Sequence, residues 1–298
     1  MQDRSHLLTE QRLPESMDLD AMTIEDAVAL MNAQDAAAVA AVARERAAIA
    51  AVVKLAADAL RSGRRLFNFG AGTSGRLGAL DAAECPPTFR TDPAVVQGVI
   101  AGGEGAMFQA HEGAEDRPED GAATVDAKEI GTRDVVIGIA TGGTTPFVHG
   151  ALGRAAQRGA RTVFLTCVRP VAGEPQADLV IRPLTGPEVI TGSTRLKAGT
   201  ATKLVLNTIS TLAMVRLGKV YQNLMIDLRA SNAKLWDRGA RIVSTVTGLG
   251  RDHALDLLRK ADGHVKVAIV MHERSVDSDR AKELLEAAGG FLRAAIGR

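Results

Sequence analysis

Short apolar runs alternate with longer helix-forming stretches through the middle of the chain. The runs cover residues 66–69, 95–100, 135–139, 162–166 and 179–181. Their length and composition are typical of buried strands. Strands that alternate with helices predict a parallel sheet covered by helices on both faces. We therefore expect an α/β fold with a doubly wound five-stranded parallel sheet.

The N-terminal part of the chain has a different pattern. Residues 1–20 are mostly polar and lack periodicity, which predicts an extended arm. An Ala-rich helical stretch then runs from Thr23 to about residue 60, and we expect two helices with a break near residues 32–35. Thr23 and Asp26 approximate a capping box at the start of the first helix.

The C-terminal part predicts a small helical domain, because short amphipathic patterns begin at about residue 229. Residues 265–271 fit a strand or a helix equally well. The chain thus divides into an N-terminal arm with helices (1–60), a central α/β domain (61–228) and a helical C-terminal domain (229–298).

The first predicted strand runs into a loop of small and hydroxylated residues, 70–75, which is followed by a helical stretch. We expect this helix to end at Glu84, Cys85 and the helix-breaking pair Pro86 and Pro87. A strand, a Gly-rich loop and a helix N-terminus together direct backbone N–H groups at one point, which favours a bound phosphate. The candidate contacts are Gly72, Thr73, Ser74 and Gly75.

The loop resembles three other motifs, but for each of them the chain lacks a residue that the motif requires. A dinucleotide fold needs an acidic residue after the next strand, but residues 101–103 are Ala-Gly-Gly. Arg76 and Leu77 stand where a nucleotide P-loop has Lys and Ser/Thr. Arg76 also replaces the last glycine of a GxSxG nucleophile elbow around Ser74. A tight strand-to-helix turn that binds no ligand remains an alternative.

The third predicted strand ends in a similar loop. Its candidate contacts are Thr141, Gly142, Gly143, Thr144 and Thr145. Because the carboxyl ends of parallel strands meet at one edge of a sheet, we expect the two loops to hold one ligand between them. Two ordinary strand-to-helix turns are the alternative.

The stretch 186–207, GPEVITGSTRLKAGTATKLVLN, is the most distinctive. Ser193 or Thr194 is expected to cap a helix that continues to about residue 217 and is buried from residue 204 onwards. The helix start is polar and contains Gly199, which is unfavourable inside a helix. We interpret this start as the approach of a ligand or a second subunit, with a solvated basic turn as the alternative.

Composition removes several classes of function. The net charge of +1 and the 3% of aromatic residues give no indication of a nucleic-acid partner. No apolar run approaches the length of a membrane span. The six histidines lack metal-site spacing, so no metal is indicated. Cys85 and Cys167 do not suggest a disulfide framework, and we expect a cytoplasmic protein.

The motifs GAGTSGRLG, DAAECPPTF, GAED and GPEVITGSTRLKAGTATK together resemble the N-acetylmuramic acid 6-phosphate etherases. The resemblance extends from residue 8 through the C-terminus. It implies a sugar isomerase (SIS) domain with a flavodoxin-like sheet at residues 61–228, and a homodimer. The last motif is shared with the glucokinase regulatory protein, which binds sugar phosphates without chemistry.

The family's activity implies cleavage of the D-lactyl ether of N-acetylmuramic acid 6-phosphate in cell-wall recycling, without metal or organic cofactor. Matching the motifs places the general acid at Glu84 and the general base at Glu115. Glu188, Ser193 and Thr194 are implied as further site residues. Without the resemblance, Glu84 still fits a general acid at the negative end of a helix, although an exposed glutamate at a helix end is the commoner alternative. Glu115 by itself fits a solvated acidic stretch.

One loop departs from the family's pattern. Gly142 and Thr144 stand where the family usually has Ser and Arg, so a charged contact to the phosphate is missing. Two other functions remain open: a sugar-phosphate isomerase on the same fold, and a regulator that binds a sugar phosphate without chemistry.

Overall fold

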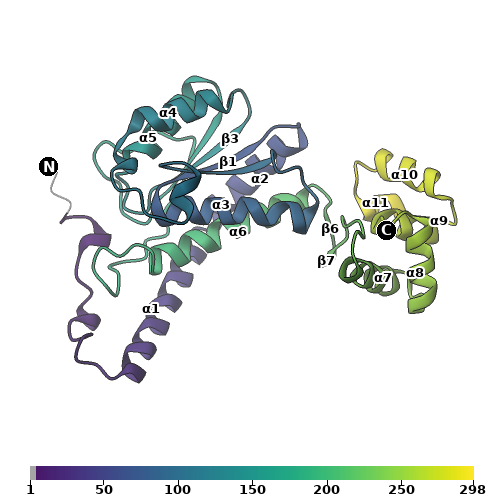
Figure 1. Cartoon of the computed structure of the whole chain (residues 1–298), viewed down its shortest axis with the longest axis horizontal. Coiled ribbons are helices and arrows are strands. Elements are labelled where there is room, and N and C mark those ends of the chain that lie inside the picture. Colours follow the sequence, from purple (N-terminus) through teal and green to yellow (C-terminus); the bar gives the residue numbers. More distant parts are fainter. Residues whose placement is uncertain (1–4) are drawn as a thin grey trace. The chain divides into compact units, whose positions relative to one another are not determined.

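The computed structural model describes residues 5–298 (Figure 1). The chain divides into two compact units, which are described separately. The first comprises residues up to 83 together with 93–210, and the second comprises 84–92 together with 211–298.

The first unit is built on a five-stranded sheet. Its strands are β1 (Leu66–Gly70), β2 (Val96–Ile100), β3 (Val135–Ile139), β4 (Arg161–Leu165) and β5 (Leu179–Ile181). All neighbouring pairs are parallel, and the order is β2-β1-β3-β4-β5. This is the flavodoxin-like order. The predicted α/β fold with a five-stranded parallel sheet is therefore confirmed.

Helices cover both faces of this sheet. They are α2 (Arg46–Arg61), α3 (Gly72–Phe89), α4 (Pro118–Ala127), α5 (Pro146–Gln157) and α6 (Lys197–Arg216). Phe67 and Phe69 of β1 join a buried cluster with side chains of α4 and α5. Asn68, between them, donates a hydrogen bond to the carbonyl of Gly78 in α3. Successive strand side chains point to opposite faces, so α3 lies across the sheet from α4 and α5.

Two glycines let α4 and α5 approach each other closely. A Cβ atom on Gly121 would lie 2.0 Å from the carbonyl oxygen of Phe147, and one on Gly150 would lie 1.9 Å from that of Pro118. No side chain larger than hydrogen fits at either position unless the helices move apart.

The N-terminal region contains η1 (Leu8–Glu10), η2 (Pro14–Ser16) and α1 (Ile24–Arg44). The approximate capping box is present: Thr23 Oγ1 accepts the N–H of Asp26 at 3.1 Å, and the Asp26 carboxylate accepts the Thr23 hydroxyl at 2.7 Å in place of the Thr23 backbone N–H. The expected break near residues 32–35 is wrong, because the chain bends at Glu45. There the Glu45 carboxylate accepts the N–H of Arg182 at 3.0 Å, so a contact distant in sequence fixes the bend.

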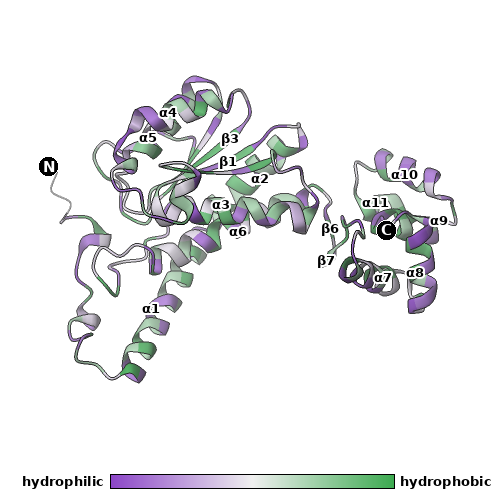
Figure 2. Ribbon diagram, viewed as in Figure 1, coloured by the Kyte–Doolittle hydropathy of each residue, from purple (hydrophilic) through white to green (hydrophobic). Residues whose placement is uncertain are grey.

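The second unit is mostly helical. Its elements are the hairpin β6 (Val220–Tyr221) and β7 (Leu224–Met225) and the helices α7 (Ala233–Thr247), α8 (Arg251–Lys260), α9 (Val265–Arg274), α10 (Ser278–Ala287) and α11 (Leu292–Ile296). Figure 2 shows hydrophilic residues along α8 and α10. The ambiguous residues 265–271 form the helix α9. Val265, Ala268, Ile269 and Val270 are fully buried there, which explains why their pattern lacks a polar face.

Candidate active site

The two predicted loops begin side by side at the carboxyl edge of the sheet. β1 pairs with β3 so that Gly70 lies opposite Ile139. The first loop leads from Gly70 into α3, and the second leads from Ile139 into α5, which begins at Pro146. The register therefore brings the starts of both loops together, as the sequence pattern predicted.

The glycines of the first loop are required by close packing. A Cβ on Gly70 would lie 2.6 Å from the backbone nitrogen of Gly75, and one on Gly75 would lie 2.6 Å from Cγ1 of Ile100. Gly72 has φ +50°, a conformation that favours glycine. It begins α3, so the N–H groups of this first turn lack partners within the helix. Gly72 is exposed, Thr73 is half-buried and Ser74 is buried.

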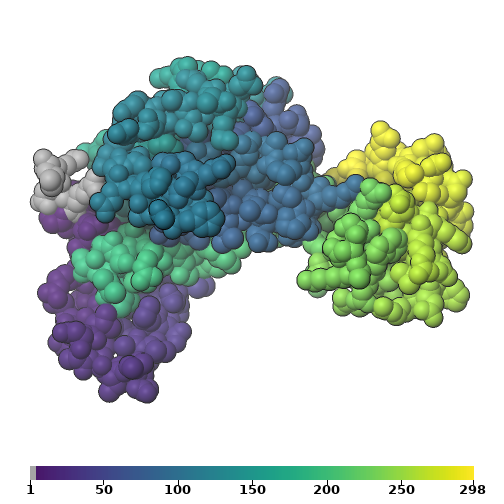
Figure 3. All heavy atoms as spheres, in the orientation of Figure 1, coloured from purple at the N-terminus to yellow at the C-terminus, as the bar shows by residue number. Residues whose placement is uncertain are grey.

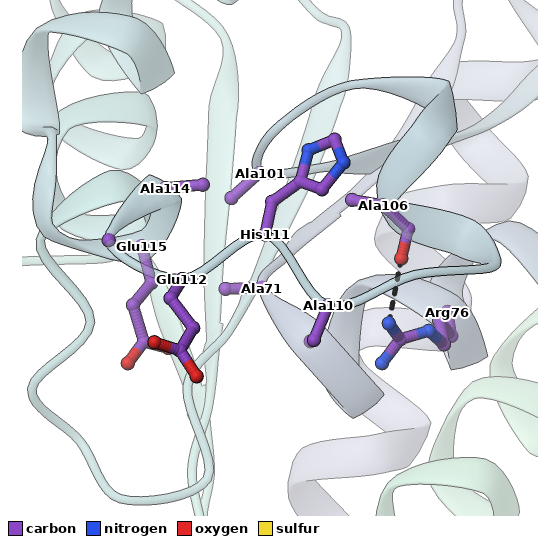
Figure 4. Close-up of a pocket in the computed structure, with 11 residues that line it drawn as sticks. Ala71, Arg76, Ala101, Ala106, Ala110, His111, Glu112, Ala114 and Glu115 are labelled. Atoms are coloured by element: carbon purple, nitrogen blue, oxygen red, sulfur yellow. Dashed lines mark hydrogen bonds between the residues drawn. The ribbon is translucent and has the colours of Figure 1, made fainter.

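A cavity of about 250 Å³ lies beside this helix start. Two of the predicted site residues, Gly72 and Glu115, line it (Figure 4). It also contains side chains that the sequence analysis did not select, namely Arg76, His111 and Glu112. In Figure 4 the two glutamates lie on the opposite side of the cavity from Arg76. The cavity thus pairs an acidic wall with a basic one.

The segment that carries Glu115 is held partly by its own contacts. Glu115 belongs to the short 3-10 helix η4 (Ala114–Asp116), which follows Gly113 in the left-handed conformation at φ +76°. The ring nitrogen Nδ1 of His111 lies 3.2 Å from the carbonyl oxygen of Gly102. Glu115 is exposed to solvent.

Glu84 is placed differently from Glu115. It is an exposed residue of α3 and does not line this cavity. The expected end of the helix at residues 84–87 is wrong, because α3 continues through Pro86 and Pro87 to Phe89. The helix ends where Arg90 takes φ +52° and its N–H bonds to the carbonyl of Pro86 at 2.8 Å. Pro86 and Pro87 have no N–H group, so α3 lacks the hydrogen bonds that these positions would otherwise donate to the carbonyls of Ala82 and Ala83.

The second loop is fixed by hydrogen bonds to its backbone. The carbonyl of buried Thr141 accepts the N–H of Cys167 at 2.9 Å. Gly143 has φ +80°, and its carbonyl oxygen lies 3.0 Å from Nε2 of His149 in α5. Burial lowers the pKa of His149, so the neutral ring is favoured and Nε2 carries the proton that it donates. Gly142, Thr144 and Thr145 are half-buried beside this anchor.

The distinctive segment 186–207 is organised by Glu188. Its side chain is fully buried, and its two carboxylate oxygens accept the N–H groups of Lys197 at 2.8 Å and Ala198 at 3.0 Å. α6 begins at Lys197, so the expected cap at Ser193 or Thr194 is wrong. Those two residues are half-buried in the turn before the helix. A carboxylate from nine residues upstream satisfies the helix start instead.

Gly199 connects this segment to the first loop. A Cβ placed on Gly199 would lie 3.6 Å from the Cγ2 methyl of Thr73. This distance is an ordinary van der Waals contact, so the fold does not require a glycine here, and the approach of a ligand or a second subunit stays a prediction. The expectation of a buried helix from residue 204 is only partly met, because Lys203, Asn207 and Thr211 form an exposed stripe and Leu212 is 43% exposed.

Within residues 5–298 no cluster of His, Cys, Asp and Glu has the arrangement of a metal site. Over the same residues, none of the helices combines the length and the apolar composition that a membrane span requires.

Comparison with known proteins identifies the class first. Residues 48–156 match the N-terminal SIS domain of the glucokinase regulatory protein, and residues 222–266 match the C-terminal lid domain of that protein. Together with the sheet order and the two loops, these matches define a SIS-domain protein. A phosphoheptose isomerase from Francisella tularensis superposes with a TM-score of 0.46 and 18% identity, over 64% of this chain and 98% of that one.

Relatives over the full length identify the family. The chain is 53% identical over 296 residues to an N-acetylmuramic acid 6-phosphate etherase of Nostoc sp., covering 99% of this chain and 96% of the relative. It is 52% identical to another from Picosynechococcus sp., covering 99% and 98%. The chain therefore belongs to the N-acetylmuramic acid 6-phosphate etherase family. The resemblance seen in its motifs is confirmed, and so is the expectation of a carbon–oxygen lyase.

Proposed function

We propose that this protein cleaves the D-lactyl ether of N-acetylmuramic acid 6-phosphate to N-acetylglucosamine 6-phosphate and D-lactate, in the recycling of cell-wall peptidoglycan. The observation that carries this proposal is the 53% identity to a family member over 99% of the chain. The cavity that brings Glu115 to the start of α3 supports it, because the reaction needs a base near a phosphate-type loop.

The proposed reaction begins with the open-chain form of the sugar. Its aldehyde acidifies the proton on carbon two, which the Glu115 carboxylate removes as general base. Lactate then leaves carbon three with a proton from a general acid, a role that we assign to Glu84 from the match of its motif and not from the cavity. Water adds its hydroxyl to carbon three of the unsaturated aldehyde, and carbon two is reprotonated. The atoms balance as one water consumed for each ether cleaved, without a metal or an organic cofactor.

The substrate's phosphate is proposed to lie between the two loops. The backbone N–H groups that begin α3 and the hydroxyls of Thr73, Ser74, Thr144 and Thr145 are suitable donors. Gly72, Gly75, Thr141, Gly142 and Gly143 complete the proposed loop contacts, and Glu188, Ser193 and Thr194 belong to the segment that packs beside Thr73. Binding energy from the phosphate orients the distant carbons for reaction.

We further propose a homodimer that uses α1. Ile24 is 79% exposed, Val28 54% and Val39 51%, and Figure 2 shows apolar positions along this helix. Exposed apolar faces of this kind mark contact surfaces, and a second copy is the partner we propose. The location proposed is the cytoplasm, and the sugar-phosphate domain proposed is residues 61–228.

The test is incubation with N-acetylmuramic acid 6-phosphate in heavy water. We expect D-lactate release and an amino sugar that gains one deuterium on carbon two. Deuterium exchange without lactate would favour an isomerase. Binding with neither result would favour a regulator.

Glu115→Gln and Glu84→Gln should each lower the rate at least ~100-fold, as expected for the loss of a general base or acid. Glu119→Gln, which changes an exposed acid in the first turn of α4, is the matched control. Near-normal turnover by either active-site variant would remove its assigned role.

A further inference from the structure

The cavity wall that carries Glu115 is a long surface segment, residues 101–116, between β2 and α4 (Figure 3). Its regular structure consists of the short 3-10 helices η3 (Glu104–Met107) and η4. Ala101 and Ala106 are its buried hydrophobic residues, whereas Phe108 is 93% exposed. A segment that buries so little apolar surface depends on polar contacts for its shape.

The guanidinium of Arg76 makes two such contacts. Its Nε donates to the carbonyl oxygen of Met107 at 2.9 Å, and its Nη2 donates to that of Ala106 at 2.8 Å. Figure 4 shows the side chain reaching from α3 to the wall of the cavity. The planar guanidinium spans two successive carbonyls with one edge, which the single ammonium of a lysine cannot reproduce.

The helix from which Arg76 reaches is held rigidly on the sheet. A Cβ on Gly78 would lie 2.8 Å from Cβ of Asn68 in β1, and a Cβ on Gly98 of β2 would lie 2.3 Å from Cα of Ala79. Contacts this close leave α3 little freedom to shift against β1 and β2. The two hydrogen bonds from Arg76 therefore hold the cavity wall, residues 101–116, in a fixed position against α3.

We propose that Arg76 is a positioning residue for the reaction: it fixes residues 101–116 so that Glu115 meets carbon two of the sugar. The proposal rests on the proposed function for the identity of the substrate. Arg76 acts through the wall, because its Nε and Nη2 are both engaged by carbonyl oxygens of that segment. Its loss should lower turnover and leave sugar-phosphate binding nearly unchanged.

The variant that isolates this role is Arg76→Lys, which retains the charge and the aliphatic stem but loses the two-pronged contact. We expect kcat to fall on the order of 100-fold, as for a reacting group misplaced by about 1 Å. KM and the Kd for N-acetylglucosamine 6-phosphate should change less than about 3-fold. Arg117→Lys is the matched control, since the Arg117 side chain is 66% exposed and forms an exposed ion pair with Asp120 at 3.9 Å. Its kcat should equal that of the unchanged protein.

Amide hydrogen exchange supplies a readout independent of activity. In Arg76→Lys, the amides of residues 102–116 should exchange faster, while those of the sheet strands keep their protection. If Arg76→Lys does not fold, Arg76→Gln, which keeps one donor, takes its place in both measurements. Normal kcat, or unchanged exchange in this segment, overturns the proposal. If the unchanged protein releases no lactate, the proposed function fails, and the exchange result alone then decides the role of Arg76.

Discussion

The carboxylate of Glu188 accepts the backbone N–H of Lys197 at 2.8 Å, and this contact starts α6. The other oxygen accepts the N–H of Ala198, and the Glu188 side chain is fully buried. Burial raises the pKa of Glu188, and the two N–H bonds oppose that rise. The intervening residues 189–196 are thereby closed into a loop that brings Gly199 against Thr73 of the first loop.

Glu188→Gln should destabilise the protein by about 2 kcal/mol, the range for loss of a charged helix cap. The glutamine amide would present N–H groups to an N–H of the helix and leave it without an acceptor. Urea unfolding of both proteins at neutral pH measures the difference. Glu119→Gln, an exposed change in the first turn of α4, is the control and should have little effect. Equal stability of Glu188→Gln and the unchanged protein would contradict this account of the helix start.

Asp81 should make stability depend on pH. It is 7% exposed and accepts a hydrogen bond from Ser210 Oγ at 2.8 Å, yet burial raises its pKa above the ordinary 3.8. At pH values between the ordinary and the raised pKa, Asp81 keeps a proton in the folded protein that it has released in the unfolded chain. Stability from this group therefore falls as pH rises from 3.8 through the raised pKa.

Asp81→Asn removes that dependence and keeps an oxygen to accept from Ser210. Its stability relative to the unchanged protein should therefore increase between about pH 4 and pH 7. Urea unfolding at several pH values measures the difference between the two proteins. A constant difference across this range would show that Asp81 keeps an ordinary pKa.

Two glycines of α5 should respond oppositely to the same substitution. Gly150→Ala should cost about 3 kcal/mol, because the new Cβ would meet the carbonyl oxygen of Pro118 at 1.9 Å. Gly153→Ala should stabilise the protein by up to about 1 kcal/mol, since its site is open and alanine is the better helix former. Thermal unfolding of the two variants compares them directly. A shift of both in the same direction would refute the close contact of α4 with α5.

His149 should control the affinity of the second loop for its ligand. His149→Leu removes the hydrogen bond to the carbonyl of Gly143, so the loop loses its anchor, and KM should rise ~10-fold. His149→Gln can still donate through its amide and should restore part of the affinity. His253→Leu changes an exposed histidine of α8 and is the control. If the Leu and Gln variants have the same KM, the hydrogen bond does not set the affinity.

Local patterns were sufficient for much of the fold. Each strand was predicted within one or two residues of its observed bounds, because a strand buried on both faces is a continuous apolar run. The capping box of Thr23 and Asp26 was predicted for a similar reason, since both partners lie three residues apart. The place of the two loops at one edge followed from the parallel arrangement alone.

Contacts between residues far apart in the sequence determined the features that local patterns did not predict. The bend at Glu45 depends on Arg182, the start of α6 on Glu188, and the second loop on His149. The sequence by itself determined the α/β sheet, its two glycine loops and, through its motifs, the family. Only the tertiary structure placed Arg76 and Glu115 in the lining of one cavity, which Glu84 does not line. The physical reason is that periodicity records which side of an element is buried, whereas a cavity depends on which segments the folded chain brings together.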